Sequence, residues 1–261
     1  MMLAVAHTGT ALNRSRPLQN LLSQRVYRQL YDAMLDHRLR PGDRLNRRQV
    51  AQDLGVSVAP VLEAMVQLEW EGFLATSPRV GTIVRGVTRA DVLGKFRLRQ
   101  AIEVEAARLY AGERIRDARR AVEPLAERAD AAETGTLANY RTEVEFHMAL
   151  VKLADCEALN EEFSHVMRHS LYHAAHDLLP ILPERTPQMH TKLIAAMCRA
   201  DAATADRLIR SHLGPWVDAL SLAVSAIGEP ASIAVTRGNA VRIASKKTAA
   251  SRRARSRRPT A

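Results

Sequence analysis

Apolar residues recur every three or four positions along most of the chain, which is the spacing of amphipathic helices. The pattern predicts a helix over residues 18–39 and two short helices, over residues 47–54 and from Ser57, as N-cap, to Trp70. A tight turn containing Gly55 separates the two short helices. This arrangement is typical of a helix-turn-helix, whose second helix enters the major groove of DNA. The alternative is any other corner between two helices.

A change of pattern follows Gly72, where the second short helix is expected to end. Residues 73–75 and 82–84 are short β-type runs on either side of a turn around Pro78 and Gly81. They predict a two-stranded hairpin, and a helix-turn-helix followed by a hairpin is a winged helix. Arg79, at the tip of this wing, is expected to contact a phosphate or the minor groove; the alternative is a solvated arginine.

The rest of the chain has helical periodicity only, which predicts an antiparallel helical bundle over residues 91–227. The expected fold class is therefore mainly α: an N-terminal winged helix-turn-helix over residues 18–87 and a C-terminal all-α bundle. Residues 1–17 are expected to be a disordered leader, and residues 228–261 a disordered basic tail. The six predicted bundle helices span residues 91–111, 115–132, 137–154, 157–182, 187–199 and 202–227.

The charge is unevenly distributed, although the chain as a whole carries a formal net charge of +10. By direct count it is roughly +5 over residues 1–90, roughly −3 over residues 91–227 and roughly +8 over residues 228–261. A basic module, a near-neutral body and a basic extension suit a nucleic acid partner. The tail would add non-specific phosphate affinity, or it is a solubilising extension.

Several functional classes find no support in the sequence. No apolar run is long enough for a membrane span, and the first residues do not have the pattern of a signal peptide. The two cysteines, Cys156 and Cys198, are too few for a disulfide framework, so a protein of the reducing cytoplasm is expected. No P-loop, nucleophile elbow, dinucleotide fingerprint or HExxH motif is present.

One polar set in the bundle has the chemistry of a metal site. Glu143 and His147 are four residues apart and so lie on one face of the third bundle helix, while His190 and His212 lie on the fifth and sixth. A carboxylate and three imidazoles converging in a bundle core would suit Zn²⁺, Ni²⁺, Fe²⁺ or Mn²⁺. The alternative is a surface hydrogen bond between Glu143 and His147, with two unrelated histidines.

A second histidine set lies along the fourth bundle helix. His165, His169, His173 and His176 form one stripe, with Arg168 beside them. The stripe would line an anion-binding cavity or titrate between pH 5 and 8. The alternative is a polar outer face.

The N-terminal segment resembles the winged-helix domain of GntR-type bacterial transcription regulators. The resemblance rests on PGDRL at residues 41–45, LGVSVAPVLEA at 54–64, LEWEGFL at 68–74 and GTIV at 81–84. It implies a homodimer that binds a pseudo-palindromic operator on double-stranded DNA. The residues expected to contact DNA are Arg44, Arg47, Arg48, Ser57, Val58, Ala59, Pro60, Leu62 and Arg79.

The bundle resembles the FadR-like C-terminal effector-binding domain of the same superfamily, known as the FCD domain. The matching segments are FRLRQAIEVEAARLYA at residues 96–111, ExxFH ending at His147, and the two later histidines. The resemblance implies a bound divalent transition metal held by Glu143, His147, His190 and His212, and a small organic acid as effector. Arg99, Arg168 and His169 are expected to contact that effector.

The chain departs from the family pattern at two places. The family commonly has Asp where Glu143 stands, and arginines where Val58 and Leu62 stand. An arginine that binds guanine through two hydrogen bonds contributes about 1–3 kcal/mol of discrimination, so altered or weakened sequence readout is expected. Val58 and Leu62 would instead meet thymine methyl groups.

The sequence thus predicts a ligand-responsive transcriptional regulator and not an enzyme. The regulator is expected to act as a repressor. Two alternatives stay open at this point. One is an all-α metal-dependent enzyme, in which a metal with open positions activates water. The other is a degenerate family member that senses a ligand but has weakened sequence-specific DNA binding.

Overall fold

The computed structural model describes residues 15–78, 80–178 and 187–226, and the chain divides into two compact units. The first unit contains described residues 15–33 and 38–85, and the second contains residues 34–37 and 86–226. Among the described helices, none is both long enough and apolar enough to cross a membrane. The predicted leader, apart from residues 15–17, the basic tail and Arg79 lie outside the described residues.

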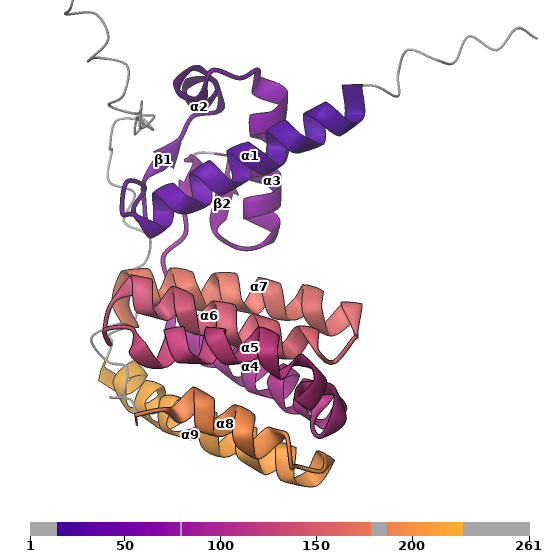
Figure 1. The fold of residues 1–261 in the computed structure, drawn as a ribbon. Helices are drawn as coiled ribbons and strands as arrows, with labels where there is room; N and C mark the ends of the chain where they lie inside the picture. Colours follow the sequence, from indigo (N-terminus) through magenta and orange to yellow (C-terminus); the bar gives the residue numbers. More distant parts are fainter. Residues whose placement is uncertain (1–14, 79, 179–186, 227–261) are drawn as a thin grey trace, which may run out of the picture. The chain divides into compact units, whose positions relative to one another are not determined.

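The first unit contains the predicted helix-turn-helix (Figure 1). Helix α1 (Ser15–Leu35) begins three residues before the predicted start and is followed by α2 (Arg47–Leu54) and α3 (Val58–Trp70). The side chain of Asn46 caps α2, and Gly55 ends it in the left-handed region at φ 66°, where glycine is favoured. Ser57 is the N-cap residue of α3 as predicted, but its side chain makes no capping hydrogen bond to the described residues.

The wing is a three-stranded antiparallel sheet in the described part of the chain, so the prediction of a two-stranded hairpin was incomplete. Strands β2 (Leu74–Ser77) and β3 (Gly81–Val84) form the predicted hairpin. The added strand is β1 (Arg44–Leu45), which pairs with β3 in the order β1-β3-β2. Two residues are too few for the alternation by which a strand is recognised from sequence.

The core of the first unit forms where α1, α3 and the sheet bury their apolar residues. Val26 and Leu30 of α1 are fully buried, as are Val61 and Leu68 of α3. An edge-to-face contact between the rings of Tyr31 and Phe73, 5.3 Å between centroids, packs α1 against the residue before β2. The Tyr27 hydroxyl donates a 2.6 Å hydrogen bond to Glu71, just after α3. These contacts fix the helix-turn-helix against α1.

The second unit is the predicted helical bundle, whose helices run side by side in Figure 1. The helices are α4 (Arg89–Tyr110), α5 (Glu113–Ala131), α6 (Leu137–Lys152), α7 (Glu157–His173), α8 (Met189–Met197) and α9 (Ala202–Ala226). Their bounds agree with the prediction to within a few residues, except in α7. There the α-helix ends at His173 and continues as a single π-helical turn, Ala174–Leu178, whereas one helix to residue 182 was predicted. Single π-turns are frequent at functional sites.

The bundle core is made by contacts between helices that are distant in the sequence. Helix α4 packs against α9, α7 and α6, while α5 packs against α8 and α6. Phe146, Phe163, Ile115 and Met197 are fully buried in one continuous apolar cluster. The histidines of the predicted metal site lie on α6, α8 and α9, so this packing decides whether they meet.

Candidate functional site

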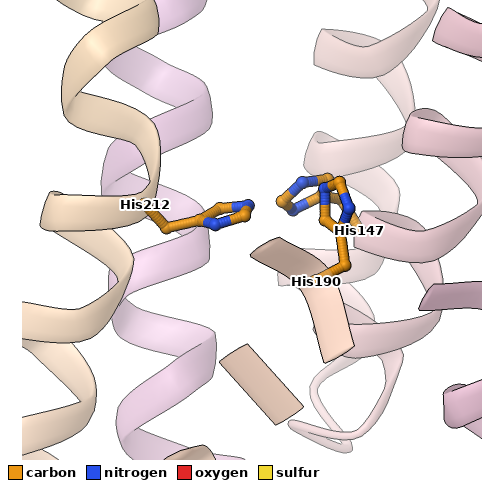
Figure 2. A group of neighbouring side chains, drawn as sticks. All are labelled: His147, His190 and His212. Carbon is orange, nitrogen blue, oxygen red and sulfur yellow. The ribbon is translucent and has the colours of Figure 1, made fainter. Parts of the chain in front are cut away.

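Three of the four predicted metal-binding residues come together in the bundle. Within the described residues, His147 of α6, His190 of α8 and His212 of α9 each offer a ring nitrogen, and these atoms all lie within 4.8 Å of one another. Figure 2 shows the rings pointing toward one another, with His212 facing the other two. His147 and His190 are buried and His212 is partly exposed. The alternative of unrelated histidines is therefore wrong.

Glu143 lies at the edge of this group. Its carboxylate oxygens are 3.2 Å from His190 Nε2 and 3.8 Å from His147 Nε2, but Glu143 does not belong to the group that shares the 4.8 Å limit. The residue is 3 % exposed, so the alternative of a surface hydrogen bond with His147 is also wrong. Glu143 thus contacts two of the imidazoles and stays a predicted metal ligand.

Two further carboxylates, absent from the sequence prediction, contact the outer nitrogens of these imidazoles. Glu103 Oε2 of α4 lies 2.6 Å from His147 Nδ1, and Asp130 Oδ1 of α5 lies 2.7 Å from His190 Nδ1. Glu103 also accepts a 2.7 Å hydrogen bond from Arg99 Nε. The sequence carried only a weak signal: Arg99 and Glu103 are a helical i,i+4 pair, which is typical of a solvated surface.

The electrostatics favour the neutral forms of the His147 and His212 imidazoles. Burial lowers the pKa of His147, although the Glu103 carboxylate beside it acts in the opposite direction. Desolvation and the nearby His147 and His190 lower the pKa of His212 to about 3. Burial raises the pKa of Glu103, but the positive charge of Arg99 and the hydrogen bonds from Arg99 and His147 outweigh it and hold that pKa well below its ordinary value.

The residues present fit a divalent transition metal. The Nε2 atoms of His147 and His190 are buried and have no hydrogen-bond partner among the described residues, which is costly for polar atoms unless something else binds them. Three imidazoles with a carboxylate are the donor set of Zn²⁺, Ni²⁺, Fe²⁺ or Mn²⁺.

The predicted effector residues have different environments. Arg99 is 2 % exposed, and its guanidinium lies 5.4 Å from the centre of the Phe96 ring as well as bonding Glu103. Arg168 is partly buried, and His169 is buried with its ring 5.9 Å from that of His173. Because His169 and His173 are both buried, the alternative of a polar outer face is wrong for these two residues. Their role as effector contacts stays a prediction.

The predicted DNA surface of the first unit has its cations on β1 and α2. Arg47 and Arg48 are exposed at the first two positions of α2, and no acidic residue lies in that turn. The positive end of a helix dipole disfavours cations, so an anion at this point would relieve the repulsion. Both arginines line a 420 Å³ pocket that reaches Gly81 and Thr82 of the wing. Arg44, next to it on β1, has a buried Nε with no hydrogen-bond partner in the described part of the chain.

Helix α3 presents an apolar face instead of a basic one. Val58 is 43 % exposed and Leu62 39 %, and Val66 and Trp70 continue the same line of residues at 53 % and 80 %. The helix contains two glutamates and no lysine or arginine. Ser57 and Ala59 are exposed, as a DNA contact requires. Pro60 was predicted to contact DNA, but it is buried with Val61 on the face of α3 that packs inward. The prediction is therefore wrong for this residue.

Comparison with protein families gives two matches that follow the two units. Residues 22–84 match the family model described as bacterial regulatory proteins, gntR family. Residues 95–214 match the model of the FCD domain. Together the matched segments include the helix-turn-helix, the wing and every residue of the histidine group.

Known proteins similar to the chain are regulators of transcription. The HTH-type transcriptional repressor RspR of Escherichia coli strain K12 is 26 % identical over 210 residues, covering 78 % of this chain and 89 % of that protein. The Nta operon transcriptional regulator of Aminobacter aminovorans is 33 % identical over 127 residues, covering 48 % and 60 %.

Two solved structures that have a similar fold illustrate the architecture. A GntR transcriptional regulator from Rhodococcus sp. RHA1 superposes with a TM-score of 0.60 at 21 % identity and covers 79 % of this chain and 99 % of that one. Escherichia coli McbR/YncC superposes with a TM-score of 0.55 at 20 % identity and covers 77 % and 98 %. At this identity the similarity supports the fold alone.

Proposed function

Because the chain belongs to the gntR family of bacterial regulatory proteins and carries an FCD domain, we propose that its bundle senses a small organic acid through a bound divalent transition metal. Membership of these families makes the chain a DNA-binding transcriptional regulator and not an enzyme. The observation that carries the proposal is the convergence of three histidines, two of which have buried Nε2 atoms without a hydrogen-bond partner among the described residues. His147, His190 and His212 would hold the metal together with Glu143.

The effector would be a small carboxylate. When bound, the metal supplies a Lewis-acidic position for one carboxylate of that molecule. Arg99, Arg168 and His169 are the residues proposed to contact it, and the cationic guanidinium of Arg99 already binds a carboxylate, that of Glu103. The effector acts on DNA binding only through its different affinity for the DNA-competent and incompetent states of the protein.

The DNA-binding form would be a homodimer on a pseudo-palindromic operator, acting as a repressor. Arg44, Arg47 and Arg48 would bind phosphates, since they gather at β1 and at the N-terminal end of α2. Val58 and Leu62 of α3 would meet thymine methyl groups, because that face offers apolar side chains and no cation. Recognition of the DNA sequence would then depend on the shape of the DNA and on contacts with thymine methyl groups more than on hydrogen bonds to guanine.

Elemental analysis of the purified full chain tests the metal proposal. We expect close to one transition-metal ion per chain in the parent protein and little or none in His147→Ala and His190→Ala. The control is His165→Ala, which removes a histidine of α7 outside the group. The same metal content in the parent and in both variants would contradict the proposal.

Genome-wide mapping of bound DNA tests the operator proposal. Full-length protein and a chain ending at residue 227 are compared, so that the contribution of the basic segment is separated. Sharp palindromic peaks with both proteins support a specific regulator. Only diffuse, salt-sensitive binding would favour the degenerate alternative instead.

A further inference from the structure

Two helices that supply no metal ligand nevertheless contact the metal-binding imidazoles. Glu103 is on α4 and Asp130 is at the C-terminal end of α5, 44 and 60 residues from their histidines. Glu103 is 2 % exposed, and the Asp130 side chain is 10 % exposed. Each carboxylate binds the Nδ1 atom of one ring, which is the nitrogen pointing away from the group in which the Nε2 atoms meet.

The bonds of Glu103 determine where the proton of His147 lies. Arg99 Nε can only donate, so Glu103 Oε1 accepts at 2.7 Å and the carboxylate is an ionised partner of the guanidinium. An ionised carboxylate is an acceptor, so at 2.6 Å His147 Nδ1 must carry the hydrogen that it donates to Oε2. In the neutral ring the lone pair is then on Nε2, the atom aimed into the histidine group.

The bonds of Asp130 lead to the same result for His190. The backbone N–H of His190 donates to Oδ1 at 3.1 Å, and the backbone N–H and the hydroxyl of Thr191 both donate to Oδ2 at 3.1 Å. With its oxygens accepting these bonds, Asp130 also accepts from His190 Nδ1 at 2.7 Å. When the His190 ring is neutral, its lone pair is therefore on Nε2 as well.

We infer that Glu103 and Asp130 are positioning residues of the metal centre, which hold His147 and His190 in the tautomer and orientation that present Nε2 to the ion. The inference rests on the proposed metal but concerns residues that do not touch it. Carboxylates that accept the second ring N–H of a metal-bound histidine fix its orientation and raise its basicity, and their loss typically weakens metal binding about 10–100-fold.

Asp130 performs a second task that links the metal centre to the start of α8. The N-cap residue of that helix, Gln188, has a left-handed backbone at φ 59° and makes no side-chain capping bond to the described residues. Asp130, from a different helix, accepts the N–H groups of His190 and Thr191 in its place. The same carboxylate thus satisfies the helix start and orients the ligand that the helix carries.

Arg99 holds Glu103 in place from one turn earlier on the same helix, α4. Its guanidinium satisfies the other oxygen of Glu103 and balances the buried charge of that carboxylate. As a result α4 and α5 join α6, α8 and α9 around one ion, although only the last three carry histidine ligands. Loading of the metal would therefore stabilise most of the bundle as one unit.

Two measurements on the full chain test the inference. Long-range ¹H–¹⁵N NMR of histidine-labelled, metal-free protein reports which ring nitrogen carries the hydrogen, and competition with a chromophoric chelator gives the Zn²⁺ affinity. The variants are Glu103→Gln and Asp130→Asn. The double variant Arg99→Met with Glu103→Gln keeps the buried charge balanced and is used where the single change prevents folding.

Matched controls make the same chemical change on the same helices. Glu105→Gln on α4 and Glu127→Gln on α5 each neutralise an exposed glutamate that makes no contact with the histidine group. Far-ultraviolet circular dichroism and the unfolding midpoint confirm that each variant is folded before its zinc affinity is compared.

The inference predicts Nδ1–H tautomers for His147 and His190 in the parent. It also predicts a Zn²⁺ affinity about 10–100-fold weaker in the Glu103 and Asp130 variants than in the two controls. Nε2–H tautomers in the parent, or affinities within about threefold of the parent in both variants, would overturn it. A parent chain that binds none of Zn²⁺, Ni²⁺, Fe²⁺ or Mn²⁺ would instead overturn the proposed metal function and the inference with it.

Discussion

Glu103 Oε2 lies 2.6 Å from His147 Nδ1, although the two residues are 44 positions apart and belong to different helices. In the proposed metal centre, this contact would orient the His147 imidazole from a helix that contributes no ligand. Support of this kind from a second carboxylate is common for metal-bound histidines.

Zinc is expected to stabilise the folded chain through the histidine group. A ligand that binds only the native state at about 100 times its dissociation constant adds about 2.7 kcal/mol to the free energy of unfolding. His212→Ala should remove most of this gain and leave the metal-free fold intact, because His212 is partly exposed. Urea unfolding with zinc and with a chelator measures both quantities. An equal gain in the parent and in His212→Ala would contradict the role of His212.

The two arginines at the start of α2 are expected to bind DNA phosphates. Arg47→Ala and Arg48→Ala should each weaken binding to the operator and to unrelated DNA by similar factors. Each should also lower the slope of log affinity against log salt by about 1, because one phosphate contact is lost. Arg119→Ala on α5 is the control, as it removes an exposed arginine of the other unit. Titrations at several salt concentrations measure the slope, and an unchanged slope would exclude the phosphate contact.

Restoring cations on α3 is expected to strengthen DNA binding. Val58 and Leu62 are 43 % and 39 % exposed, so Val58→Arg and Leu62→Arg should fold normally. Each new arginine that reaches a guanine would contribute about 1–3 kcal/mol, or roughly a 5- to 150-fold tighter complex on matching sites. Leu109→Arg, at a 45 % exposed position of α4, controls for the added charge. If neither α3 variant binds any sequence more tightly than that control, α3 is not in the groove.

Acid is expected to destabilise the bundle through His173. Burial, followed by nearby His169, lowers the pKa of His173 from 6.5 to about 3, while Asp91 opposes and Lys95 and His176 add to the shift. In the unfolded chain the His173 imidazole binds a proton below pH 6.5, whereas in the folded chain it stays neutral until about pH 3. The folded state is therefore not penalised above pH 6.5, and it loses stability as the pH falls from 6.5 toward 3. The loss approaches about 1.4 kcal/mol per pH unit.

Replacement of the residue isolates this contribution. The free energy of unfolding is measured with denaturant for the chelator-treated parent and for His173→Gln between pH 7 and pH 4.5. It should fall less steeply with decreasing pH in the variant than in the parent. Because His212 titrates in the same direction, the difference between the two curves is the relevant quantity. Parallel curves would show that His173 is not buried in its neutral form.

Much of the fold could be predicted because helix signals are local. The bounds of α2 follow from Asn46, which caps its start, and Gly55, which ends it in the left-handed region. Strand β1 could not be predicted, since its two residues become a strand only by pairing with Ile83 and Thr82 far along the chain. The end of α7 at His173 was also missed, because the apolar periodicity continues through the π-turn that follows.

The candidate site was predictable in its histidines but not in the residues that support them. His147, His190 and His212 were expected from family spacing, and the structure brings their ring nitrogens together. No local sequence pattern identifies Glu103 and Asp130, because each contacts its histidine only through the packing of helices. Pro60 shows the opposite case, in which a residue inside a recognised motif faces the interior.

Anomalous X-ray scattering from crystals of the metal-loaded full chain, measured above and below the absorption edge of the metal, tests the central claim most directly. The predicted result is one strong difference peak per chain, bounded by the Nε2 atoms of His147 and His190 and by the ring of His212, at ligand distances of about 2.0–2.2 Å. A peak at any other place in the chain, or no peak in protein that contains the metal, would contradict the account.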